Sequence, residues 1–158
     1  MVNCMIVTVS DTRTPDTDKG GQLVRYYLEK AGYRITDYRI VKDDYEGIRE
    51  LIHEASGSTK VEAVILTGGT GISPRDTTYE AVSSLLDKQL PGFGEIFRYL
   101  SFTEDIGAAA ILSRAIAGTS GGTAVFSIPG STGAVKLAME RIIIPELGHV
   151  MREIYKKE

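Results

Sequence analysis

Residues 62–76 read Glu62-Ala63-Val64-Ile65-Leu66-Thr67-Gly68-Gly69-Thr70-Gly71-Ile72-Ser73-Pro74-Arg75-Asp76, and this stretch decides the fold. Its first half is a short, continuous apolar run ending in glycines, which is typical of a strand buried on both faces of a parallel sheet. Its second half has three glycines within four positions. Glycine permits positive φ angles and lets backbone N–H groups approach an anion with no Cβ in the way. The stretch therefore predicts a central strand followed by a loop that binds phosphate.

The end of this loop distinguishes it from an ordinary turn, which is all that a glycine pair after a strand would indicate. The run ends in Arg75-Asp76, which places a phosphate-binding guanidinium beside a carboxylate able to bind a metal ion. The helix expected from Thr77 adds the positive end of its dipole. The chain contains neither the Walker A pattern nor G-x-G-x-x-G, so the loop indicates phosphate without specifying the ligand.

Segments on both sides of this stretch alternate between strand and helix patterns. The other strands are expected at Cys4 to Val9, Arg34 to Val41, Arg114 to Gly118 and Thr123 to Ile128. Helices are expected over residues 23–31, 44–56, 77–86, 93–100, 106–112 and 132–142. Pro91-Gly92 is expected to interrupt regular structure before the helix at residues 93–100, and a last helix is expected beyond Pro145. This alternation predicts one α/β domain over residues 1–158, with a mostly parallel sheet covered by helices on both faces.

The composition is that of an ordinary globular domain. The chain has 158 residues and a net charge of −3, with no basic stripe, so nucleic acid is not an expected partner. A lone cysteine, Cys4, excludes an internal disulfide and is expected to be a buried small hydrophobe. The N-terminus lacks the features of a signal peptide, and no apolar run reaches the roughly 18 residues that cross a bilayer. We therefore expect a soluble, cytoplasmic protein without a membrane partner.

Four polar or glycine-rich segments follow predicted strands, and they are far apart in the sequence. They are Ser10-Asp11, Val41 to Asp44, Thr67 to Asp76, and Pro129 to Thr132. Open α/β sheets bind ligands outside the carboxyl ends of their strands. These segments are therefore expected to meet at one edge of the sheet and to form one site there.

Two carboxylates in these segments form a candidate magnesium site. Asp44 is a good N-cap for the helix that follows it, so Asp43 is free to face the site. Asp43 and Asp76 together would provide the one or two carboxylates that Mg²⁺ takes beside phosphate oxygens and water.

Several further residues have two readings that the sequence leaves open. Ser131 or Thr132 caps a helix, either for that purpose alone or while also holding a second anion. Glu95 fits the first turn of a helix, where an acid complements the dipole. Arg114, before a strand, is by its position more often a surface residue than a site residue. His53 and His149 have no partner in the sequence for metal or triad chemistry, and both are assigned to structure.

At this point the motifs, taken in order, resemble the MogA/MoaB family, and in length and in the P-G-S-T form they are more similar to its MoaB branch. They are Ser10-Asp11, Thr67 to Gly71 with Pro74-Arg75-Asp76, Pro91 to Glu95, Leu112 to Ala115, and Pro129 to Ser131. The resemblance covers nearly the whole chain. It implies a three-layer α/β/α molybdopterin-binding domain that forms homo-trimers or homo-hexamers.

The same resemblance implies an activity and a set of site residues. Active members transfer AMP from Mg-ATP to the terminal phosphate of molybdopterin and release pyrophosphate, and the product goes on to a molybdate-inserting enzyme. Asp43 and Asp76 match the family's acidic residues, which act in catalysis and in binding Mg²⁺. The positions that match its substrate- and nucleotide-binding residues are Ser10, Asp11, Thr67, Gly68, Gly69, Thr70, Gly71, Arg75, Glu95, Ser113, Arg114, Pro129, Gly130 and Ser131.

Three other functions compete with adenylylation. A non-catalytic molybdopterin-binding or carrier protein would keep the fold and release no pyrophosphate. An interaction scaffold would need the linkers or second domain that this chain lacks. A flavodoxin-like redox protein would be yellow when purified, and no motif here supports it.

Overall fold

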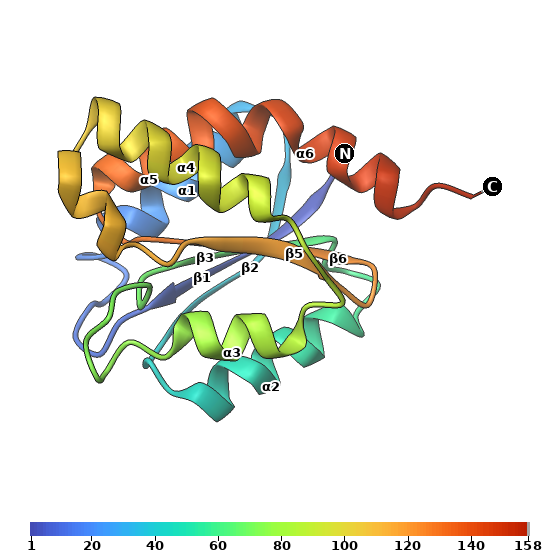
Figure 1. The fold of residues 1–158 in the computed structure, drawn as a ribbon. Helices are drawn as coiled ribbons and strands as arrows, with labels where there is room; N and C mark the ends of the chain where they lie inside the picture. The colour runs from blue at the N-terminus through green and yellow to red at the C-terminus, as the bar shows by residue number, and fades with distance from the viewer. Residues whose placement is uncertain (158) are drawn as a thin grey trace.

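The computed structural model describes residues 1–157 as a six-stranded sheet between two layers of helices (Figure 1). The strands lie in the order β2-β1-β3-β6-β5-β4. Strands β2, β1, β3 and β6 are parallel, and β5 is antiparallel to both β6 and β4. The strands are β1 Asn3–Val9, β2 Arg34–Val41, β3 Ala63–Thr67, β4 Lys88–Gln89, β5 Ile116–Ser120 and β6 Thr123–Ile128. The expected α/β class with a mostly parallel sheet is thereby confirmed.

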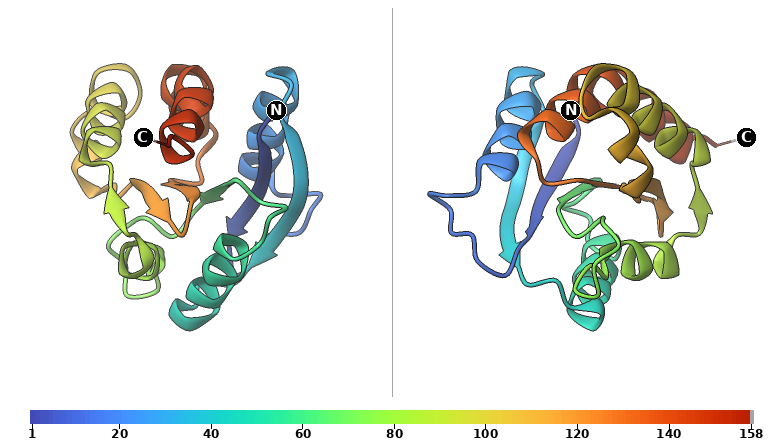
Figure 2. Two further views of the ribbon diagram at one scale, coloured as in Figure 1. Left: turned by 90° about the vertical axis from the view of Figure 1, so that its right-hand side faces the viewer. Right: turned by 60° about the vertical axis from the view of Figure 1, so that its left-hand side comes forward.

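Helices cover both faces of this sheet, as Figure 1 and the further views in Figure 2 show. One layer contains α1 (Lys19–Lys30), α4 (Pro91–Glu104), α5 (Thr132–Ala138) and α6 (Ile144–Ile154). The other layer contains α2 (Tyr45–Ser56) and α3 (Thr78–Leu85), and a 3₁₀ helix, η1, spans Gly107–Leu112. Within residues 1–157, no helix has both the length and the apolar character needed to cross a membrane.

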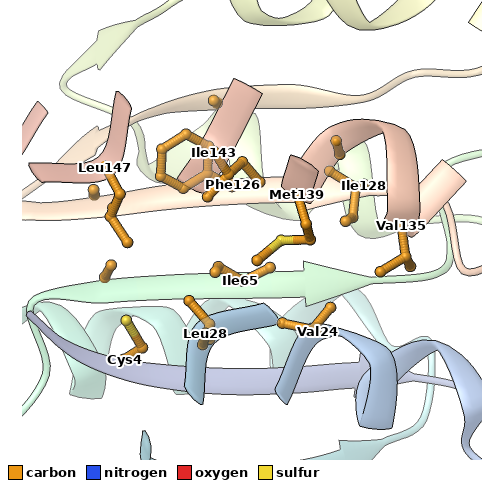
Figure 3. Packing of buried hydrophobic residues seen from close by; sticks show 14 of the residues in the cluster. Cys4, Val24, Leu28, Ile65, Phe126, Ile128, Val135, Met139, Ile143 and Leu147 are labelled. Carbon is orange, nitrogen blue, oxygen red and sulfur yellow. The ribbon is translucent and has the colours of Figure 1, made fainter. Parts of the chain in front are cut away.

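The core has two parts because the side chains of a strand alternate between the two faces of the sheet. In β3, Ile65 faces the layer with α1 and α5, whereas Val64 and Leu66 face α2 and α3. Figure 3 shows Ile65 close to Met139 and Leu28 in the larger cluster. Every residue of β3 is buried, as the apolar run in the sequence predicts.

Two prolines that are expected to precede helices lie inside them. Pro91 is the first residue of α4, where its missing N–H would have no helical partner in any case. Pro145 lies within one continuous helical stretch, because the π-helical segment Met139–Ile143 joins α5 to α6. In that segment the Ile144 N–H donates to the Met139 carbonyl, so the wider turn adapts the helix to the proline. The predicted break before α4 is therefore confirmed, with the helix starting at Pro91 itself, whereas the predicted interruption at Pro145 is wrong.

The thiol of Cys4 is expected to be unreactive in the folded protein. Cys4 is fully buried in β1, and burial raises the pKa of its thiol to about 12. Since the thiolate is the reactive form, labelling by a thiol reagent at pH 8 should be slower by a factor on the order of 10³ than for an exposed thiol. One thiol per chain should react in denaturant. Prompt labelling of the folded protein would contradict this placement.

Candidate active site

The predicted loops lie side by side at the carboxyl ends of the parallel strands. The Gly68 N–H donates to the carbonyl of Ile128 at 2.9 Å, which joins the glycine loop to the end of β6. The Ser10 N–H donates to the carbonyl of Val41 at 2.8 Å, which joins the loops after β1 and β2. The Asp43 N–H donates to the Asp11 carboxylate at 3.3 Å. Four segments that are far apart in the sequence therefore form one rim.

The glycine loop has a conformation that requires glycine at two consecutive positions. Gly68 and Gly69 have φ angles of +102° and +70°, in the region that side chains disfavour. A Cβ on Gly68 would overlap the Val9 carbonyl oxygen. A Cβ on Gly69 would lie 2.5 Å from a carboxylate oxygen of Asp43. The loop is thus packed closely onto β1 and onto one of the candidate carboxylates.

Asp43 has a structural role that its position in the sequence does not reveal. Its side chain is buried, and Oδ1 accepts hydrogen bonds from the Thr77 N–H at 3.1 Å and the Thr77 hydroxyl at 2.6 Å. Asp43 therefore caps α3 from another loop, while Oδ2 lies beside Gly69. The neighbouring Asp44 caps α2 by accepting the Gly47 N–H at 2.8 Å, as expected.

An exposed ion pair joins two of the loops at the rim. Arg75 donates through Nη2 and Nε to one carboxylate oxygen of Asp11, at 2.7 and 3.2 Å. The hydrogen bond from Arg75, followed by that from the Asp43 N–H, holds the pKa of Asp11 below its ordinary value. The Arg75 side chain is 67% exposed, so its remaining donors can reach an anion from solvent.

The Arg114 guanidinium binds backbone carbonyls of the glycine loop, so the expectation of a surface arginine is wrong. Its Nε donates to the Gly71 carbonyl at 2.9 Å and its Nη2 to the Asp76 carbonyl at 3.2 Å. The guanidinium also pairs with the Glu80 carboxylate, whose pKa is lowered by that hydrogen bond, and lies over the Tyr79 ring. The sequence gives no signal for Glu80, because its partner is distant along the chain.

Replacing Arg114 by lysine should loosen this loop. A single ammonium cannot bridge two carbonyls and a carboxylate as the planar guanidinium does. We expect the free energy of unfolding, measured with urea, to fall by about 1–2 kcal/mol. The matched control is Arg152→Lys at an exposed position near the end of α6, which should change it by less than about 0.5 kcal/mol. Equal stability of the two variants would contradict the assigned role.

A cavity of about 330 Å³ opens beside the loop. Residues 69–71, Asp76 and residues 129–131 line one side, and α4 and η1 line the other. Its volume is in the range of small-molecule sites. Ser131 lies at this edge and caps α5 by accepting the Ala134 N–H at 3.2 Å, so the capping role is present. Ser113 also lines the cavity, and its buried hydroxyl has no hydrogen-bond partner among residues 1–157.

Glu95 lies in a different cavity from the glycine loop. A hollow of about 430 Å³ is lined by Glu95, Arg98 and Arg114, and it shares only Ser113 with the first cavity. Because α4 begins at Pro91, Glu95 falls in the second turn, and the expectation of a first-turn acid is wrong. Arg98 donates to the carbonyls of Ala115 and Ser113 at 3.2 and 3.4 Å, so it also holds the segment that leads into β5.

The carboxylates beside the loop suit Mg²⁺ bound together with a phosphorylated substrate. Within residues 1–157, no group of three or more His, Cys, Asp or Glu side chains could hold a metal ion. Asp43 and Asp76 each place a carboxylate oxygen beside the loop, near Gly69 and Gly71. Magnesium commonly takes one or two carboxylates and completes its shell with phosphate oxygens and water, so this donor set fits it.

Comparisons with known proteins identify the family to which the chain belongs. A family model described as "Probable molybdopterin binding domain" matches residues 5–149. Molybdenum cofactor biosynthesis protein B of Halalkalibacterium halodurans is 66% identical over 155 residues, covering 98% of this chain and 91% of that protein. A crystal structure of molybdenum cofactor biosynthesis protein B has a TM-score of 0.95 at 54% identity, covering 99% of this chain and 97% of the other.

A more distant solved structure has the same fold. The tungsten cofactor synthesizing protein MoaB from Pyrococcus furiosus has a TM-score of 0.87 at 37% identity, and the match covers 98% of each chain. The motif resemblance is confirmed by these matches: the chain belongs to the MogA/MoaB family of molybdopterin-binding domains.

Proposed function

We propose that this protein acts in molybdenum-cofactor biosynthesis by adenylylating molybdopterin with Mg-ATP and releasing pyrophosphate. One observation carries the proposal: the glycine loop and the Asp76 carboxylate line a cavity large enough for a small molecule, and the Asp43 carboxylate lies against the same loop. The names of the similar proteins support the pathway. The loop and the carboxylates support the transfer of a nucleotidyl group.

The proposed reaction requires that the phosphate of molybdopterin and the phosphates of ATP be aligned, and it does not require a base to ionise the attacking oxygen. A phosphate monoester has a second pKa of about 6, so the attacking oxygen is largely ionised at neutral pH. The chain then has to bring two phosphorylated molecules into line and screen their repulsion. The N–H groups of the glycine loop and the exposed Arg75 provide donors for this task. No histidine or cysteine is required.

Asp43 and Asp76 would hold the metal ion. An ion held there would supply positive charge to screen the phosphate oxygens around the α-phosphorus. Ser73 orients Asp76, because its N–H donates to Oδ2 of that carboxylate at 2.9 Å. Arg114 fixes the backbone of Asp76 from the other side.

The proposal extends to the assembly in which the protein works. We place the reaction in the cytoplasm, in a homo-trimer or homo-hexamer that passes its product to a molybdate-inserting enzyme. Large apolar side chains on α4, on η1 and between them are exposed in the single chain, including Tyr99, Ile106 and Ile111. Such a surface favours association with further copies. Analytical ultracentrifugation would give the number of subunits.

A second candidate is a non-catalytic molybdopterin carrier. The observation in its favour is that Oδ1 of Asp43 is occupied by donors at the start of α3, so Asp43 has one oxygen left for a metal. Incubating the protein with molybdopterin and Mg-ATP and measuring pyrophosphate separates the two functions. Release that depends on molybdopterin supports the enzyme. Binding of molybdopterin without release supports the carrier.

A further inference from the structure

Two arginines lie in or against the glycine loop, and their guanidinium groups are held in different ways. Arg114 donates through all three of its nitrogens, to two backbone carbonyls and to Glu80. Arg75 donates through Nε and Nη2 only, to one oxygen of Asp11, at 3.2 and 2.7 Å. A guanidinium has five N–H donors, and with two of them used here, three on Arg75 have no partner among residues 1–157. Arg75 therefore has one edge bound to protein and another edge free.

The Asp11 carboxylate joins three segments of the rim. Oδ2 accepts both bonds from Arg75, and Oδ1 accepts the Asp43 N–H at 3.3 Å. Asp11 follows β1, whereas Asp43 follows β2 and Arg75 follows β3. The hydrogen bond from Arg75 keeps the pKa of Asp11 below its ordinary value, so the group is ionised at neutral pH. An ionised carboxylate has no hydrogen to donate, so Asp11 can hold Arg75 but offers no donor to a phosphate.

The main chain around Arg75 is fixed as a turn, whereas its side chain depends on Asp11. The Asp76 N–H donates to the Ser73 carbonyl at 2.9 Å, and the Ser73 N–H donates to Oδ2 of Asp76 at 2.9 Å. The Arg75 side chain is 67% exposed, and no other group of the described chain binds its guanidinium. A long exposed side chain with no such contact samples many rotamers. The bond to Asp11 therefore selects the direction of the free donors.

We propose that Asp11 is a positioning residue for phosphate binding, which holds Arg75 by its Nε edge and leaves the other edge of the guanidinium free for a phosphate group of the ligand. This assignment rests on the proposed function, in which Arg75 provides donors to phosphate. A side chain that is already held in place loses less conformational entropy when it binds. Asp11 then acts through Arg75 and does not contact the phosphate itself, although the family resemblance places it among the binding residues.

The geometry argues against the opposite role, in which Asp11 would block Arg75 until a phosphate displaced it. Arginine binds phosphate through two parallel N–H groups. The Asp11 oxygen lies at the edge formed by Nε and Nη2, so the edge formed by Nη1 and Nη2 still has one N–H from each nitrogen. A phosphate can therefore bind the second edge while the first stays bound to Asp11.

The test is a double-mutant cycle on the binding of inorganic pyrophosphate, measured by titration calorimetry with Mg²⁺ and without molybdopterin. Arg75→Gln should weaken binding at least about tenfold, because it removes the charged donors. Asp11→Asn should weaken binding about threefold to fivefold in the wild-type background, because the guanidinium loses its fixed direction. In the Arg75→Gln background the sign should change. There, Asp11→Asn should strengthen binding slightly, since it only removes a negative charge near an anion.

Asp37→Asn is the matched control, because it breaks an ion pair of the same geometry elsewhere. Oδ2 of Asp37 accepts from Nε and Nη2 of Arg39 at 3.0 and 2.9 Å, and this pair also reaches the surface. Asp37 lies opposite Met5, near the start of β1 and away from the rim. The variant should bind pyrophosphate like the wild type. Urea unfolding of every variant separates loss of binding from loss of structure.

Three results would overturn the assignment. Binding by Arg75→Gln at the wild-type strength would remove Arg75 from the phosphate site. Tighter binding by Asp11→Asn in the wild-type background would make Asp11 a competitor of the phosphate, and equal weakening in both backgrounds would show that it does not act through Arg75. The measurement involves no turnover, so it is independent of adenylylation. A cycle with the expected signs in a protein that never releases pyrophosphate from molybdopterin and Mg-ATP keeps this inference and removes the proposed activity, whereas turnover with equal weakening in both backgrounds does the reverse.

Discussion

Replacing Asp76 by asparagine is expected to abolish adenylylation while leaving the fold and its stability close to those of the wild type. The side chain is partly buried, and Oδ2 accepts the Ser73 N–H at 2.9 Å. An asparagine carbonyl can accept the same bond, so the loop should keep its shape, but the charge that attracts the metal ion is lost. We expect pyrophosphate release to fall at least about 10³-fold, since a bound metal supplies several kcal/mol of transition-state stabilisation.

The matched control for this variant is Asp87→Asn. Asp87 is another carboxylate that accepts a backbone N–H, from Gly121 at 2.7 Å, but it lies by the β5–β6 turn, at the opposite end of β6 from the site. It should retain wild-type turnover. Circular dichroism and urea unfolding would show that both variants are folded. Turnover by Asp76→Asn at the wild-type rate would remove Asp76 from the mechanism.

Replacing Gly69 by alanine is expected to destabilise the protein by about 3 kcal/mol and to abolish ligand binding at the loop. The residue has a φ of +70°, and its new Cβ would overlap the Thr78 hydroxyl oxygen and lie 2.5 Å from an oxygen of Asp43. To make room, the loop must move away from both groups, which separates Asp43 from the start of α3. Urea unfolding gives the stability change, and the pyrophosphate assay gives the loss of function.

Gly92→Ala is the control for this substitution. Gly92 is in the first turn of α4 and has an ordinary φ, and a methyl group on its Cα would extend into open space. Alanine is a better helix former than glycine, so the stability of this variant should be unchanged or slightly higher. If Gly69→Ala were as stable as Gly92→Ala, the close packing of the loop would not matter to the fold.

The parts of the fold that the sequence predicts are those with a local cause. The apolar run of β3, the glycines after it and the Asp44 cap each depend on a few neighbouring residues, and the structure has all three. The rule that ligands bind at carboxyl strand ends is enough to bring the loops together. Strand β4 is not predicted, because its two residues, Lys88–Gln89, carry no periodic pattern.

What the sequence does not predict depends on contacts between distant residues. Asp43 caps a helix that begins far along the chain at Thr78, and no local pattern indicates this. The position of Arg114 in the sequence favours the surface, because its partners come from the glycine loop and α3.

The position of β6 has a consequence for how the protein is made. This strand pairs with β3 in the middle of the sheet, with Ala124 opposite Ala63, yet it is the last of the strands to be synthesised. While residues 123–128 are still in the ribosome, the nascent chain exposes the unpaired apolar edge of β3. Such an edge invites aggregation until its partner arrives. When β6 pairs with β3, the Gly68 N–H also gains its hydrogen bond to the Ile128 carbonyl. The same pairing therefore covers the edge of β3 and completes the glycine loop.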